Sequence, residues 1–190
     1  MFGRKTRTHN HERGQSLVEL TLGMAVLVML ISGLVDLGRA YFVYVALEDG
    51  AGEAALYLSI TPDCWHSSNV PFDGIGNCAD PNNAINRATN AGGGSNSLVN
   101  WENIPEGYIV ATWEDNDSAN TATYQGTDTV PSVNALPSTY KSQVGPGDTV
   151  TVSIRYDFQL LTPFIPKITG VNPLPLRAEA SQWIVDDPNP

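Results

Sequence analysis

The chain is poor in the residues from which most catalytic and metal sites are built. Its 190 residues include two cysteines and three histidines, and only 16% of them are charged. The sequence contains no G-x-S-x-G, H-E-x-x-H, paired Cys-x-x-Cys or G-x-G-x-x-G pattern. His66 is the only histidine beyond residue 11, and beside Trp65 in a polar loop it is more typical of a surface residue than of a general base. We therefore expect a protein that is not an enzyme and that needs no cofactor and no metal.

Basic residues are also scarce. Ten Lys and Arg stand against twenty Asp and Glu, which gives a formal net charge of -10. A nucleic-acid-binding face needs a basic patch, so this balance argues against DNA or RNA as a partner. Four of the ten basic residues stand before residue 14, where they are better explained as a membrane-topology signal than as a nucleic-acid arm.

Charge is missing altogether from Leu20 to Val35, inside an apolar run. From Ser16 to Val35 a helix would measure ~30 Å, the thickness of a bilayer core. The basic residues precede this run, so we expect a single-pass protein of the cell (inner) membrane, with its N-terminus cytoplasmic. We divide the chain into a basic leader (1–14), a long helix (15–59) and an extracytoplasmic α+β domain (60–190).

Glu19 does not fit an ordinary signal peptide or a plain anchor. A secretory signal would be shorter and would end at a small-residue cleavage site, which this run lacks. A plain anchor explains the length of the run but not an acid just inside it, which costs up to ~3 kcal/mol at mid-helix and less near the end. An acid in a membrane segment is by default a candidate functional residue.

Two short stretches resemble one family. Residues 14–19 (GQSLVE) resemble the class III signal of type IV pilin-like proteins, and residues 36–40 (DLGRA) resemble the D-x-G-R-A segment of TadE-like pseudopilins of tight-adherence (Flp) pili. Residues 147–152 (GDTVTV) and 160–163 (LLTP) resemble later parts of that family, in which the first of the two opens a strand.

The resemblance implies a structural role in pilus assembly and surface adhesion. It implies that a prepilin peptidase cuts after Gly14, which leaves Gln15 as the first mature residue. Glu19 would then pair with the new amino group of Gln15 on a neighbouring pilin-like subunit, and Asp36, Gly38 and Arg39 would form the helix motif. The partners would be the peptidase, other pilin-like subunits and the lipid membrane.

A different class of function stays open at this point. A single-pass surface receptor or carbohydrate-binding protein would also carry an outer β domain on one helix. Trp101 and Trp113, if exposed, are the sequence features that favour it.

Cys64 and Cys78 both follow the apolar run and so face an oxidising compartment in this topology, where a disulfide is favoured. Closing a loop of this length would stabilise the fold by ~3 kcal/mol in the chain-entropy model. Half of a metal site is the alternative, and it could recruit only His66.

The outer domain is expected to be a small antiparallel sheet of three to five strands covered by the outer half of the helix, a pilin-like α+β fold. Residues 149–159 alternate apolar and polar side chains, which predicts a strand with one packed face. Further strands are expected at 108–113, 119–124 and 176–185, a short helix at 82–90, a flexible joint at 91–95 and an irregular connection at 160–175. Asp36 and Arg39 can pair on one helix face. An apolar stripe beyond them should bury itself against the sheet: Val43, Leu47, Ala51, Ala54, Ala55 and Leu58.

Overall fold

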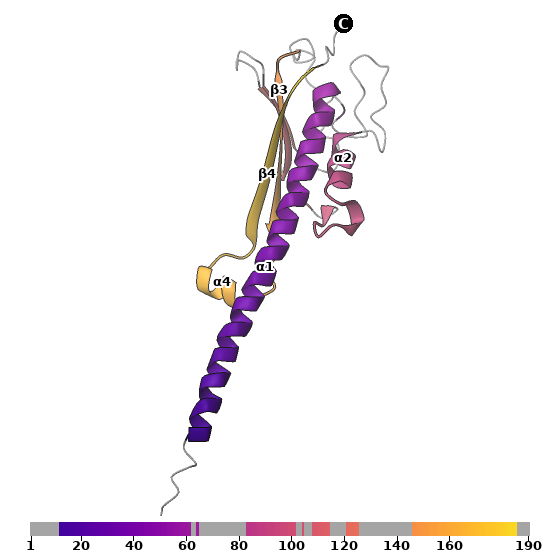
Figure 1. Cartoon of the computed structure of the whole chain (residues 1–190). Coiled ribbons are helices and arrows are strands. Elements are labelled where there is room, and N and C mark those ends of the chain that lie inside the picture. The colour runs from indigo at the N-terminus through magenta and orange to yellow at the C-terminus, as the bar shows by residue number, and fades with distance from the viewer. Residues whose placement is uncertain are drawn as a thin grey trace, which may run out of the picture.

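The computed structural model describes residues 12–61, 64, 83–101, 104, 108–114, 121–125 and 146–185. Figure 1 shows a long helix, α1, running along one side of a sheet and extending well beyond it toward the N-terminus. This confirms the expected α+β class. The expectations for His66 and Cys78 fall outside the described residues.

α1 (Glu12–Ile60) is one uninterrupted helix of 49 residues. The segment contains no proline, so nothing interrupts its hydrogen-bond ladder. Its N-terminal half stands free of the domain and is exposed on every side, whereas its C-terminal half is partly buried. The predicted helix is confirmed, and it begins a few residues earlier than expected.

The sheet has four antiparallel strands in the order β2-β1-β3-β4. They are β1 (Ile109–Glu114), β2 (Thr121–Gln125), β3 (Thr149–Phe158) and β4 (Leu174–Trp183). Val152 of β3 pairs with Ala111 of β1 on one side and with Ala180 of β4 on the other. All four predicted strands are present, and β3 lies inside the sheet, between β1 and β4.

The outer half of α1 covers the packed face of the sheet. All six residues of the predicted stripe are buried, in one core cluster that includes Val150, Val152 and Ile154 of β3. At the far end, the Val185 N–H donates to the Ser59 carbonyl at 3.1 Å. The helix and the sheet therefore share one hydrophobic core.

The opposite face of the sheet is polar. There the Tyr108 hydroxyl donates to Asp157 Oδ2 at 2.9 Å, and the Arg155 guanidinium lies 4.7 Å from the centroid of the Tyr108 ring. The hydrogen bond to Asp157 raises the pKa of Tyr108. This face carries the polar half of the β3 alternation, as expected for a one-sided sheet.

α2 (Ala84–Ala91) packs on the other side of α1. Asn83 caps it by accepting a hydrogen bond from the Asn86 N–H at 2.9 Å, and the helix confirms the one expected at 82–90. The expectation of a flexible joint at 91–95 was wrong. Gly92 closes α2 through its N–H to the Ala88 carbonyl, and Gly93, at φ +96°, leads into the 3-10 turn η1 (Gly94–Asn96).

The expectation of an irregular connection at 160–175 was also wrong, because this stretch contains α4 (Phe164–Thr169). Pro166 stands in its first turn, where a missing N–H removes no intrahelical hydrogen bond. Gly170, at φ +70°, ends the helix. Figure 1 shows α4 beside α1, below the sheet and toward the N-terminal half of the long helix.

Candidate functional site

The free half of α1 has the length and composition of a membrane span. Every described side chain from Gly14 to Leu30 is exposed, including the large apolar ones. A helix that is apolar all round is stable only where lipid or other chains surround it. The helix therefore fits a single-pass membrane protein.

The residues of the expected processing signal lie on this free surface. A Cβ atom added at Gly14 would meet nothing within 4 Å. Gln15 Nε2 donates to Glu19 Oε1 at 3.3 Å, one turn further along the helix. Among the described residues, Glu19 forms no ion pair.

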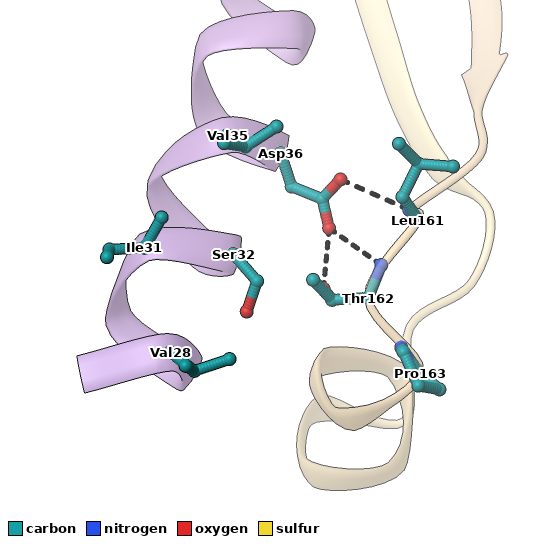
Figure 2. A pocket seen from close by; sticks show the side chains of 8 residues that line it. All are labelled: Val28, Ile31, Ser32, Val35, Asp36, Leu161, Thr162 and Pro163. Carbon is teal, nitrogen blue, oxygen red and sulfur yellow. Dashed lines mark hydrogen bonds between the residues drawn. The ribbon is translucent and has the colours of Figure 1, made fainter. Parts of the chain in front are cut away.

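Asp36 lies where the apolar run ends, and it binds the connection between β3 and β4. Its carboxylate accepts hydrogen bonds from the Leu161 N–H at 3.1 Å, the Thr162 N–H at 3.0 Å and the Thr162 hydroxyl at 2.5 Å. Figure 2 shows the carboxylate pointing from α1 straight at this loop. Asp36 is only 2% exposed, so three donors replace the water that this charge loses. We call Asp36, Leu161 and Thr162 the aspartate clamp.

Arg39 supports the clamp from the next turn of α1. Its Nη1 lies 3.6 Å from Asp36 Oδ1, which is the ion pair expected from their spacing. The guanidinium also lies 5.2 Å from the centroid of the Phe158 ring at the end of β3. Gly38 lies between Asp36 and Arg39 in the sequence. A Cβ atom added there would meet nothing within 4 Å, so no contact within the described chain requires glycine at this position.

Sequence reasoning missed Leu161 and Thr162 as the partners of Asp36. The two stretches that meet here, 36–40 and 160–163, were each matched to the same family from the sequence. What the sequence lacked was any sign that residues more than 120 positions apart touch. The one usable signal is that an acid at the end of an apolar run needs hydrogen-bond donors, which N–H groups of a loop can supply.

Next to the clamp lies a pocket of about 450 Å³ between α1 and the loop. Figure 2 shows the side chains that line it, coming from both sides of the gap. The lining is mostly apolar, and its residues are Val28, Ile31, Ser32, Val35, Asp36, Leu161, Thr162 and Pro163.

A carbohydrate-binding protein would need exposed tryptophan rings, but Trp101 and Trp113 are both buried. Trp101 is 7% exposed and Trp113 is 1% exposed, and both belong to the hydrophobic core. The expectation of exposed indole rings was wrong, because each ring fills space next to α1 or the sheet. The carbohydrate-binding alternative thus loses the observation that favoured it.

Cys64 is buried and is not a free thiol. Cys78 lies outside the described residues, so a Cys64–Cys78 disulfide stays a prediction. No group of three or more His, Cys, Asp or Glu side chains that could hold a metal ion occurs within the described ranges.

Residues 14–56 match a family model whose description is TadE-like protein. The matched segment contains the apolar run of α1, Glu19 and the stretch Asp36–Arg39, and it confirms the resemblance seen in the sequence. The match supports a function related to tight-adherence pili, in a family of structural rather than enzymatic proteins. No curated protein and no solved structure matches the chain.

Proposed function

We propose that this protein, whose long helix carries a TadE-like segment, is a membrane-anchored minor pilin or pseudopilin that acts structurally in assembly of a tight-adherence (Flp-type) pilus. One observation carries the proposal. The matched segment includes residues 14–30 of α1, which are exposed all round and in which Glu19 is the one charged residue. A surface of this kind suits both lipid and the helices of other pilin-like subunits.

The proposed topology follows from the charges. The basic residues before the apolar run stay in the cytoplasm, and the sheet domain lies outside the inner membrane. The division into a leader (1–14), a helix (15–59) and an outer domain (60–190) belongs to the same proposal.

Glu19 supplies the subunit contact. Cleavage after Gly14 creates a positive amino group on Gln15, four positions before Glu19. The Gln15 side chain already reaches the Glu19 carboxylate within one chain, and the same carboxylate is exposed to a neighbouring helix. An ion pair between the amine of one subunit and the acid of the next offsets the cost of placing each charge in an apolar bundle and fixes their register.

The proposal is tested by the mass of the N-terminus. Purified from cells that express a prepilin peptidase, the protein should begin at Gln15, and from cells without the peptidase it should keep the leader. Gly14→Val should block cleavage, because a branched side chain replaces the residue at the cut. Gly23→Val is the matched control, since Gly23 is equally open on the same helix and should leave cleavage unchanged.

A leader that remains on the wild-type chain in peptidase-positive cells would contradict the proposal. Cleavage of Gly14→Val at the wild-type level would also contradict it, because the cut would then be independent of the proposed signal.

A further inference from the structure

The connection between β3 and β4 is held against α1 at the outer end of its charge-free run. The aspartate clamp fixes Leu161 and Thr162 to Asp36, the first residue after the charge-free run. On the helix side, the pocket next to the clamp extends from Val28 to Asp36, which is ~12 Å along a helix axis. If the charge-free run spans the bilayer core, this pocket opens into the outermost ~12 Å of that core.

The surface at this depth is apolar on both sides of the pocket. Leu161 is 67% exposed, Pro163 is exposed next to it, and Val171 beyond α4 is exposed too. Facing them, Val28, Ile31 and Val35 are exposed on α1. These side chains continue the apolar surface of the free half of α1. Lipid that surrounds that half of the helix can therefore also reach the pocket.

The charge of the connection differs from that of the rest of the chain. Between Asp157 and Arg177 the only charged residue is Lys167, in a chain with a net charge of -10. Lys167 is exposed in the last turn of α4. Its ammonium can extend to anionic lipid headgroups while its aliphatic stem stays in the apolar layer.

The backbone of the connection is also suited to a low-dielectric layer, where each unsatisfied N–H is costly. Asp36 takes the N–H groups of Leu161 and Thr162, and Gly170 donates its own to the Pro166 carbonyl. Pro163 and Pro166 have no N–H to satisfy. The clamp thus removes two donors that would otherwise face hydrocarbon.

We propose that residues 161–171 dock into the outer leaflet of the bilayer as a second membrane contact, with a lipid acyl chain lying in the pocket between α1 and Leu161–Pro163. This inference depends on α1 spanning a membrane, as in the proposed function. It does not depend on cleavage after Gly14 or on assembly with other subunits. Because α1 and the sheet share one core, this second contact would fix the tilt of helix and domain together relative to the membrane.

The test uses the full chain, purified and reconstituted into liposomes of phosphatidylethanolamine and phosphatidylglycerol. The photo-crosslinking residue p-benzoylphenylalanine replaces Leu161, which is exposed and can be changed without disturbing the core. Leu22 on the free half of α1 is the positive control, and Leu98, exposed near η1, is the negative control.

Illumination followed by mass spectrometry should give a phospholipid adduct at position 161 at a level close to that at position 22. The adduct should exceed that at position 98 by at least about tenfold, because transfer of a leucine-sized side chain into hydrocarbon is favoured by at least that ratio. Lys167→Glu should reduce the adduct at 161 and leave that at 22 unchanged.

Lipid adducts at 22 with none at 161 would overturn the docking proposal and leave the membrane anchor in place. Adducts from 161 to a second copy of the chain would also overturn it, since the pocket would then receive a neighbouring helix. Absence of lipid adducts at both positions would overturn the anchor as well. None of these results bears on processing, which the N-terminal mass tests separately.

Discussion

At the scale of single residues, Asp36 connects two parts of the chain that are distant in sequence. Its charge is buried, but three donors from Leu161 and Thr162 and the nearby Arg39 guanidinium compensate it. Hydrogen bonds to a charged group contribute more than neutral ones, and an acceptor left unpaired in a buried site is costly. Changes at the clamp should therefore have larger effects than similar changes on the surface of the sheet.

Thr162→Val should lower the free energy of unfolding by about 1.5–3 kcal/mol, because it deletes one donor to a buried carboxylate. The backbone N–H of residue 162 remains, so the clamp weakens without being lost. Denaturant unfolding of the detergent-solubilised chain measures the effect. Thr151→Val is the matched control, since its hydroxyl meets only the exposed hydroxyl of Ser181 at 2.8 Å. Equal losses in the two variants would show that the clamp contributes nothing beyond an ordinary surface contact.

At the scale of elements, α1 and α2 approach closely because small residues face each other. A Cβ atom added at Gly50 would lie 2.9 Å from both the Ala88 carbonyl oxygen and the Trp101 ring, whereas one added at Gly52 would meet nothing within 4 Å. The two glycines stand two positions apart on the same helix. Replacing each with alanine changes helix propensity equally, so any difference in stability between the two variants reports the packing at Gly50.

Gly52→Ala should raise the free energy of unfolding by about 1 kcal/mol, the usual difference between glycine and alanine inside a helix, because the added Cβ meets no other atom within 4 Å. Gly50→Ala gains the same propensity but must displace α2 or Trp101, and overpacking of this kind costs about 1–3 kcal/mol. Its net effect should be unchanged stability or a loss. Thermal unfolding of both variants decides the point, and a gain at Gly50 equal to that at Gly52 would contradict the packing argument.

The elements that the sequence predicted best are those with a strong period. β3 follows from the alternation of Val150, Val152 and Ile154 with polar residues, and the buried face of α1 follows from its apolar stripe. α4 was missed because Pro163 and Pro166 are helix breakers in most contexts and six residues carry too little pattern. The clamp was missed for a different reason, since Asp36 and Thr162 are joined by tertiary packing that no local rule encodes.

At the scale of the whole molecule, the two halves of α1 differ in chemistry. From Gly14 to Val35, α1 presents apolar surface on which Glu19 is the one charged residue, and its C-terminal half buries the apolar stripe in the domain core. Under the proposed function, the free half is where subunits meet, and Glu19 is the residue that decides whether they do.

Glu19→Gln should leave membrane insertion and cleavage intact but prevent assembly. Removing one member of a buried ion pair costs about 3–5 kcal/mol, since the remaining charge is left without a partner. Co-purification with other pilin-like subunits and a count of surface pili should both fall to a small fraction of the wild-type level. Glu48→Gln makes the same change at an exposed position beyond the apolar run and should be neutral. Wild-type pili in the Glu19 variant would show that this acid has no part in assembly.

The domain is fastened to α1 at two places, by Asp36 at the level of α4 and by Ser59 at the other end. These positions are ~35 Å apart along the helix. β3 and β4 run alongside α1 between them (Figure 1), so a pull along the helix axis acts parallel to the strands. Their hydrogen bonds are then loaded in shear and share the force, instead of breaking one after another as in peeling. The domain should therefore resist traction along the axis of α1 better than traction across it.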